Sequence, residues 1–113
     1  MASEHLEQAK LVSWFRKNYD PVHRIYAIPN GGKRSMMAGM AAKVEGLTAG
    51  VPDLMIPSLK LFIELKKVKG GALTIQQQDW LDYLNSVGYV AIRCNGFEDA
   101  KTNILLLMGM SNN

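Results

Sequence analysis

Three charged residues flank two short apolar runs in the middle of the chain. Asp53 precedes the first run, and Glu64 and Lys66 close the second. The interval suits two short strands joined by a turn near Pro57-Ser58, and a hairpin of this length brings its outer ends together. Glu64 and Lys66 are two positions apart, so on a strand they lie on the same face. Two carboxylates and an ammonium group at one sheet edge predict a divalent-metal site that acts on a phosphodiester.

Glu64 is the most informative of the three, because it follows the apolar run Leu61–Ile63. A carboxylate carried into apolar surroundings needs a partner or a metal ion. Asp53, Glu64 and the backbone carbonyl of Leu65 form an oxygen ligand set for a hard divalent cation, and Lys66 would orient the attacking water or offset transition-state charge. Taken singly, each residue also fits a turn or a solvated strand face. The combination favours the site.

Length and composition limit the class of protein in which this site can lie. The 113 residues, 48% of them hydrophobic, predict a single domain over residues 1–113 with a packed core. A net charge of +3 is compatible with nucleic acid without being diagnostic. The single cysteine, Cys94, excludes an internal disulfide and a cysteine-based zinc cluster, and is expected to be a buried, inert thiol. Neither a signal peptide nor an apolar run of the ~18 residues that span a membrane is present, so no membrane association is expected.

The elements that must position these residues follow from capping residues and periodicity. Ser3 caps a first helix that Asp20-Pro21 ends, and Thr74 with Gln77 has the spacing of a capping box. The other expected elements are a strand over 23–28, a helix over 35–45 closed by Gly46, the hairpin strands, a strand over 89–94 and a last helix from Phe97 to about Gly109 after an Asn95-Gly96 turn. The order helix, strand, helix, strand, strand, helix, strand, helix predicts a mixed sheet flanked by helices, in the α/β or α+β class.

The ordered motifs resemble one nuclease family over nearly the whole chain. Pro52-Asp53 and Glu64-Leu65-Lys66 look like the PD-(D/E)xK motif, and the chain resembles more narrowly the virus-type replication-repair nuclease (VRR-NUC) domain of small stand-alone phage proteins. The matching stretches are Glu4 with Gln8, Ile28–Gly32, Ala49–Asp53, Phe62–Lys66, Gln77–Trp80 and Gly88-Tyr89. The resemblance implies a restriction-endonuclease-like core and metal-dependent DNA cleavage. It also implies a place of action in the cytoplasm of a bacterial host.

The resemblance assigns roles to individual residues. Asp53 and Glu64 would bind Mg²⁺ or Mn²⁺, Lys66 would be the catalytic lysine, and an acid on the first helix would complete the site. Glu4 fits that position by its spacing to Gln8, and Glu7 is the alternative; both also suit a helix start through the helix dipole. Gln77 matches a glutamine near the family's active site, whereas its capping role with Thr74 competes for the same side chain.

Substrate contacts and assembly are expected outside the hairpin. Candidate DNA-binding residues lie in loops: Asn30, Gly31, Lys33, Arg34, Lys67 and Lys69. The stand-alone members of the family resemble junction-resolving enzymes, which implies a homodimer that cuts four-way (Holliday) junctions or related branched DNA, with the helix over 36–44 as a candidate interface. The alternatives are the same chemistry on flap, single-strand or duplex DNA, and a non-catalytic DNA-binding module with the same fold.

Overall fold

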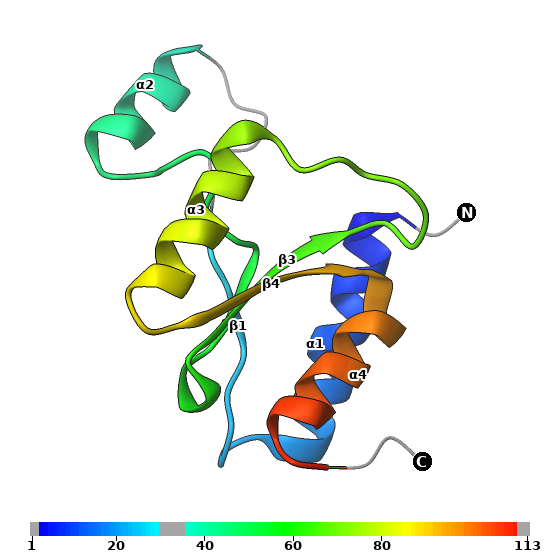
Figure 1. Cartoon of the computed structure of the whole chain (residues 1–113). Coiled ribbons are helices and arrows are strands. Elements are labelled where there is room, and N and C mark those ends of the chain that lie inside the picture. Colours follow the sequence, from blue (N-terminus) through cyan, green and yellow to red (C-terminus); the bar gives the residue numbers. More distant parts are fainter. Residues whose placement is uncertain (1–2, 30–35, 111–113) are drawn as a thin grey trace.

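The computed structural model describes residues 3–29 and 36–110, and within them it has the expected order of helices and strands. The elements are α1 (Glu4–Tyr19), β1 (Tyr26–Ala27), α2 (Met36–Val44), β2 (Leu54–Ile56), the 3-10 helix η1 (Pro57–Leu59), β3 (Leu61–Lys66), α3 (Ile75–Ser86), β4 (Val90–Asn95) and α4 (Gly96–Leu107) (Figure 1). This mixed α/β arrangement confirms the predicted fold class.

The four strands form one mixed sheet in the order β1-β2-β3-β4. The expected hairpin is present: β2 and β3 are antiparallel, with Leu54 opposite Ile63, and η1 joins them. β3 and β4 are parallel. The strand expected over 23–28 is shorter and covers only Tyr26–Ala27. Its single neighbour, β2, has three residues, of which Leu54 and Met55 pair with it, so the ladder cannot cover the six residues expected.

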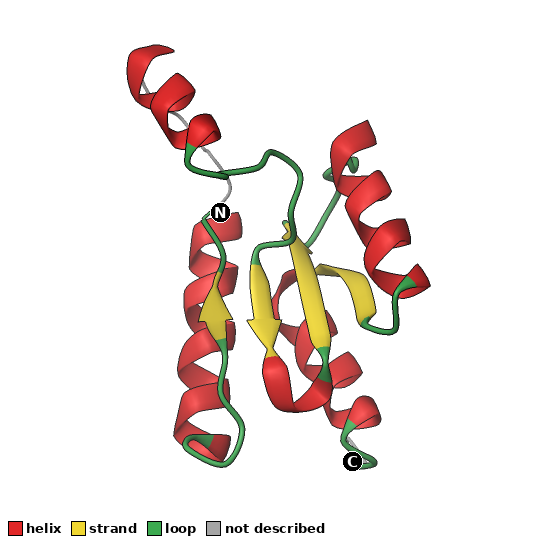
Figure 2. Ribbon diagram, turned by 90° about the vertical axis from the view of Figure 1, so that its left-hand side faces the viewer, coloured by secondary structure: helices red, strands yellow, loops and turns green. Residues whose placement is uncertain are grey.

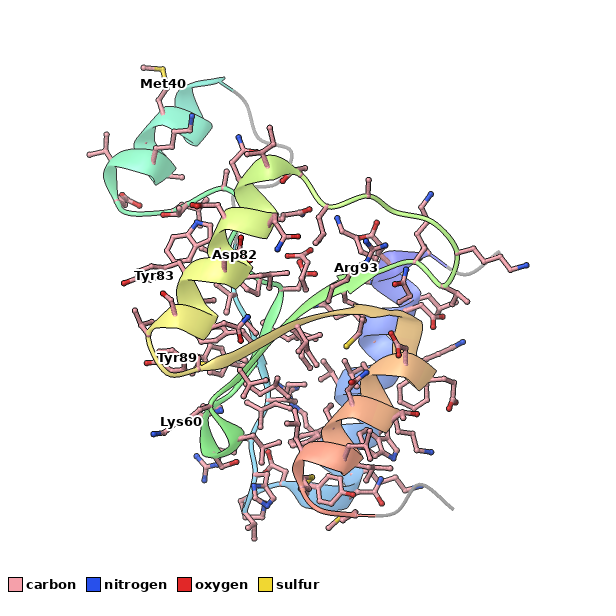
Figure 3. The ribbon with its side chains drawn as sticks, viewed as in Figure 1. Met40, Lys60, Asp82, Tyr83, Tyr89 and Arg93 are labelled. Carbon is pink, nitrogen blue, oxygen red and sulfur yellow. The ribbon has the colours of Figure 1, made fainter. Side chains whose placement is uncertain are left out.

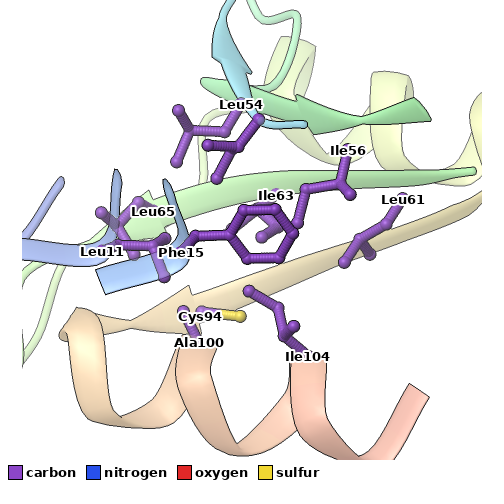
Figure 4. Packing of buried hydrophobic residues seen from close by; sticks show 11 residues of the cluster. Leu11, Phe15, Leu54, Ile56, Leu61, Ile63, Leu65, Cys94, Ala100 and Ile104 are labelled. Atoms are coloured by element: carbon purple, nitrogen blue, oxygen red, sulfur yellow. The ribbon is translucent and has the colours of Figure 1, made fainter. Parts of the chain in front are cut away.

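The two faces of the sheet are covered by different helices, and this determines on which face the candidate site residues of β3 lie. α1 and α4 lie against one face and α3 against the other (Figure 1). Alternate residues of β3 (Leu61, Ile63 and Leu65) enter the core under α1 and α4, which Figure 4 shows in close view. The residues between them (Phe62, Glu64 and Lys66) therefore lie on the α3 face.

Helix starts follow the capping predictions. The Ser3 hydroxyl accepts a hydrogen bond from the Leu6 N–H (3.1 Å), and α1 ends at Tyr19 before Asp20-Pro21. Thr74 and Gln77 form the reciprocal capping box of α3. No turn separates β4 from α4, because Gly96 begins the helix directly, with φ of +85°.

α2 projects away from the body of the domain (Figures 1 and 2). Met40 and Val44, on its later half, are 62% and 89% exposed. These two apolar side chains of α2 are therefore largely open to solvent. None of the helices in residues 3–29 and 36–110 has the length and apolar character to span a membrane.

Candidate active site

The hairpin brings the expected acidic residues together through two specific hydrogen bonds. The Asp53 N–H donates to the Ile63 carbonyl (3.0 Å), and the Leu65 N–H donates to Oδ2 of Asp53 (2.8 Å). The Asp53 carboxylate thus lies across the end of β3, next to Glu64. A side chain fixed by a backbone amide is held in place before any ligand arrives.

Glu64 is buried, with 2% exposure, and its two oxygens have different surroundings. Oε2 accepts a hydrogen bond from Nε2 of Gln77 (3.3 Å) and lies 3.9 Å from Nζ of Lys66. Oε1 is also buried, and no group in the described part of the chain donates to it. A buried carboxylate oxygen without a donor is costly unless a cation or a proton occupies it.

The protonation of Glu64 reflects this environment. Burial is the largest cause that raises its pKa, to about 8, and the charge of Asp53 and a hydrogen bond with Asp53 come next. The Lys66 charge lowers this pKa, whereas the Glu4 charge raises it further. Two carboxyl groups that share one site cannot both ionise easily. Without a bound cation, Glu64 is therefore mostly protonated at neutral pH.

Gln77 joins α3 to the site with a single amide group. Its Oε1 accepts from the Thr74 N–H and from Nζ of Lys66, both at 2.9 Å, while its Nε2 donates to Glu64. The sequence interpretation treated helix capping and a place at the site as competing. The structure shows that expectation to be wrong, because both lone pairs of one oxygen are used.

Gly50 explains how the segment before Asp53 reaches α3. Its φ is +90°, and a Cβ at this position would lie 2.6 Å from Cβ of Gln76 and 2.8 Å from its carbonyl carbon. Only a glycine allows the backbone to pass this close to the first turn of α3. The glycine of the Gly50–Asp53 motif thus sets the distance between the hairpin and the helix that carries Gln77.

We expect Gly50→Ala to unfold at a lower temperature than Gly46→Ala. Both positions have positive φ, which costs a residue with a Cβ roughly 1–2 kcal/mol, but nothing lies within 4 Å of a Cβ at Gly46. The additional decrease in melting temperature of Gly50→Ala, relative to Gly46→Ala, therefore reports the steric cost of the close approach to Gln76. Thermal unfolding followed by circular dichroism checks this, and equal melting temperatures would show that the approach carries no energy.

Glu4 and Glu7, the two candidate acids of the first helix, have different surroundings. Glu7 is buried, its Oε1 accepts from the Phe97 N–H (2.9 Å), and this hydrogen bond is the main reason that its pKa is lowered. Glu7 therefore caps the start of α4, where Gly96 leaves room for the carboxylate. Glu4 is exposed, and its charge acts on Glu64.

The candidate DNA-binding residues fall into two groups. Lys67 and Lys69 are exposed in the loop that directly follows β3. The others, Asn30, Gly31, Lys33 and Arg34, lie outside the described residues. The exposed lysines next to Lys66 give the site a basic neighbourhood on one side.

Two β4 residues that the sequence interpretation did not single out lie beside the site. Arg93 is in register with Glu64, and Asn95 is in register with Lys66. Neighbouring residues of parallel strands project from the same face, so all four lie on the α3 face. The signal in the sequence was the alternation of polar with apolar residues in 90–95, which a buried parallel strand does not need.

The donor set suits a small oxygen-preferring cation. Mg²⁺ is commonly held by one or two carboxylates and keeps several waters, and Asp53 and Glu64 supply that number, with the unpartnered Oε1 of Glu64 as the best observation for it. Among the described residues, no three or more His, Cys, Asp or Glu side chains are grouped so that they could hold a metal ion. Glu4 is thus near enough to influence Glu64 but is not itself part of a preformed ligand cluster. Cys94 does not contribute, since burial raises the pKa of its thiol to about 12.

A mixed sheet whose hairpin carries an aspartate at one end and a Glu-x-Lys sequence at the other defines a nuclease core of the PD-(D/E)xK type. The sequence model of the VRR-NUC domain matches residues 2–98. The chain belongs to this family, which is a family of nucleases that act on DNA. A solved structure described as a VRR_NUC domain protein has the same fold, with a TM-score of 0.80 and 22% identity over 98% of this chain and 92% of the other. A search of curated protein sequences finds no match.

Proposed function

We propose that this chain is a metal-dependent, structure-specific DNA endonuclease that works as a homodimer on four-way junctions or related branched DNA. The observation that supports the chemistry best is the buried Oε1 of Glu64, which has no donor among the described residues. The same carboxyl group interacts with Asp53, and its other oxygen, Oε2, lies 3.9 Å from Nζ of Lys66. A carboxylate pair of this kind would hold Mg²⁺ or Mn²⁺, with the Leu65 carbonyl as a further ligand. The bound ion would supply an activated water and neutralise developing negative charge.

The protein groups have separate tasks in this proposal. Asp53, fixed by the Leu65 N–H, and Glu64 would hold the cation, and Glu64 would release its proton to do so. Lys66, held at 2.9 Å by Gln77, presents its ammonium group to the scissile phosphate and offsets the charge that develops there. Lys67 and Lys69, with Asn30, Gly31, Lys33 and Arg34, contact the DNA backbone, which makes binding dependent on salt.

The proposed assembly follows from the size of the domain and from α2. A chain of 113 residues offers little surface to grip a branched duplex alone. The exposed apolar side chains of α2, Met40 and Val44, favour a contact with a second copy. A two-fold dimer would place two sites on one junction, as paired symmetric cuts require.

Cleavage of labelled DNA tests the proposal. The protein is incubated with linear duplex, flap and four-way-junction DNA in Mg²⁺, in Mn²⁺ and in chelator, with Lys66→Ala as the inactive control, and its mass in solution is measured. The expected result is paired cutting of the junction, only with metal, by a dimer. Lack of any cleavage would favour a non-catalytic DNA-binding module. Equal cutting of plain duplex, or a monomer at micromolar concentration, would contradict junction resolution.

We expect alanine variants of Glu4 and Glu7, the two acids of α1, to have different effects on stability and on cleavage. Glu7→Ala leaves the partly buried Phe97 N–H without its acceptor and lowers the melting temperature by several degrees, because a donor that loses its partner away from water is costly. Glu4→Ala leaves the melting temperature unchanged and lowers cleavage, because Glu4 is proposed as the acid of the first helix that assists the metal site. The opposite pattern, a stable but inactive Glu7→Ala, would assign that role to Glu7.

A further inference from the structure

The loop between β3 and α3, residues 67–73, is held in place by two side chains of β4. Nη2 of Arg93 donates to the carbonyls of Gly70 (3.1 Å) and Gly71, and Nδ2 of Asn95 donates to the carbonyls of Lys67 (2.9 Å) and Gly70 (3.0 Å). In Figure 3 Arg93 lies between β4 and this loop. Four hydrogen bonds to the carbonyls of three loop residues fix the path of a loop that has two glycines with positive φ.

The same loop packs against Lys66. A Cβ at Gly71 would lie 3.3 Å from Cβ and 3.4 Å from Cδ of Lys66, so the backbone of Gly71 covers the aliphatic part of the lysine. Lys66 is only 8% exposed as a result. With its stem covered on this side, its ammonium group lies against Gln77 and Glu64.

We propose that Arg93 is a positioning residue for Lys66, which it holds through the backbone of Gly70 and Gly71. This inference rests on the proposed function, since Lys66 is the lysine of the cleavage site. Arg93 does not need to contact DNA in this role. Its loss removes two of the four hydrogen bonds that hold the loop, and the loosened Gly70-Gly71 backbone then uncovers the aliphatic part of Lys66 and lets the ammonium group move.

The first test compares Arg93→Met with Arg24→Met. Arg24 also donates to a loop carbonyl, that of Pro21, and its replacement removes the same charge at a distance from the site. Arg93→Met is expected to lower kcat on cleavable DNA by about 10²-fold, the loss that a misplacement of about 1 Å causes, with a smaller change in KM. Arg24→Met keeps the wild-type kcat. Equal kcat in wild type and a folded Arg93→Met would overturn the inference.

The second test reads the position of Lys66 without DNA or metal. In protein with labelled lysines, the ammonium signal of Lys66, assigned from its absence in Lys66→Ala, is expected to be protected from exchange with water. It should lose that protection in Arg93→Met and keep it in Arg24→Met. An unchanged signal in Arg93→Met overturns the inference even if the wild type cleaves DNA. Wild-type protein that cleaves nothing refutes the proposed function instead, whatever the signal shows.

A glycine pair tests the same contact with Arg93 intact, in case Arg93→Met does not fold. Gly70 and Gly71 both have positive φ, but only a Cβ at Gly71 meets Lys66, while nothing lies within 4 Å of one at Gly70. Gly71→Ala is expected to lower kcat and to shift the Lys66 signal more than Gly70→Ala does. Equal effects of the two variants on both readouts would contradict a path from Arg93 to Lys66 through Gly71.

Discussion

Replacing Asp53 by asparagine is expected to lower DNA cleavage by on the order of 10²–10³-fold, the loss typical of removing one electrostatic group from a site. The asparagine oxygen can still accept from the Leu65 N–H, which donates to Oδ2 of Asp53 at 2.8 Å, so the hairpin keeps its geometry. The charge is lost, and with it half of the carboxylate pair proposed to bind the cation. Single-turnover cleavage of the preferred DNA, with the melting temperature of each protein, measures both effects.

Asp82→Asn is the matched control for this change. Asp82 is an exposed carboxylate on α3 that accepts one hydrogen bond, from Gln78 (2.9 Å), and it lies outside the proposed site. The Asp82→Asn variant should cleave DNA at the wild-type rate. The Asp53 variant has a second signature, because the Asp53 charge is one of the causes that raise the pKa of Glu64. The pKa of Glu64 should therefore fall in Asp53→Asn, and wild-type cleavage by this variant would refute the site.

Replacing Glu64 by glutamine is expected to abolish cleavage and to remove the contribution of Glu64 to the pH dependence of stability in the metal-free protein. The folded pKa of Glu64, about 8, lies above the ordinary value of 4.5. Between these two values the folded state binds a proton that the unfolded state has released. Wild-type stability contributed by this group is thus fully present below pH 4.5 and is lost as pH rises through about 8.

Chemical unfolding in chelator at several pH values measures this effect. The free energy of unfolding of the wild type should fall by up to ~1.4 kcal/mol for each pH unit within that window, and that of Glu64→Gln should be flatter. Parallel pH profiles would show that Glu64 is ionised in the folded protein. Metal binding should have the opposite trend, because the cation displaces a proton: the Mn²⁺ affinity of the wild type should rise with pH up to about 8.

The features that the sequence predicted are those that depend on near neighbours. Ser3 and Thr74 cap helices because their hydroxyl groups reach an amide three residues away. The hairpin forms because two apolar runs flank a turn, and its register then brings Asp53 to the end of β3. The element order and the meeting of Asp53, Glu64 and Lys66 therefore followed from local patterns.

The features that the sequence did not reveal depend on partners far along the chain. Glu7 caps a helix that begins 89 residues later, and nothing near it in the sequence indicates this. Gly50 is required by a contact with Gln76, and Arg93 by carbonyls of the 67–73 loop. The expected strand over 23–28 was too long because its length is set by β2, the neighbour that pairs with it.

The shared oxygen of Gln77 makes the first turn of α3 and the lysine one cooperative unit. Oε1 accepts from both the Thr74 amide and Lys66, so fraying of the helix end removes the acceptor that holds the ammonium group. Helix ends open locally at a small fraction of the free energy of global unfolding. By reciprocity, whatever fixes Lys66 also slows that opening. Hydrogen exchange at the Thr74 amide should therefore report how well the site is assembled while the sheet stays folded.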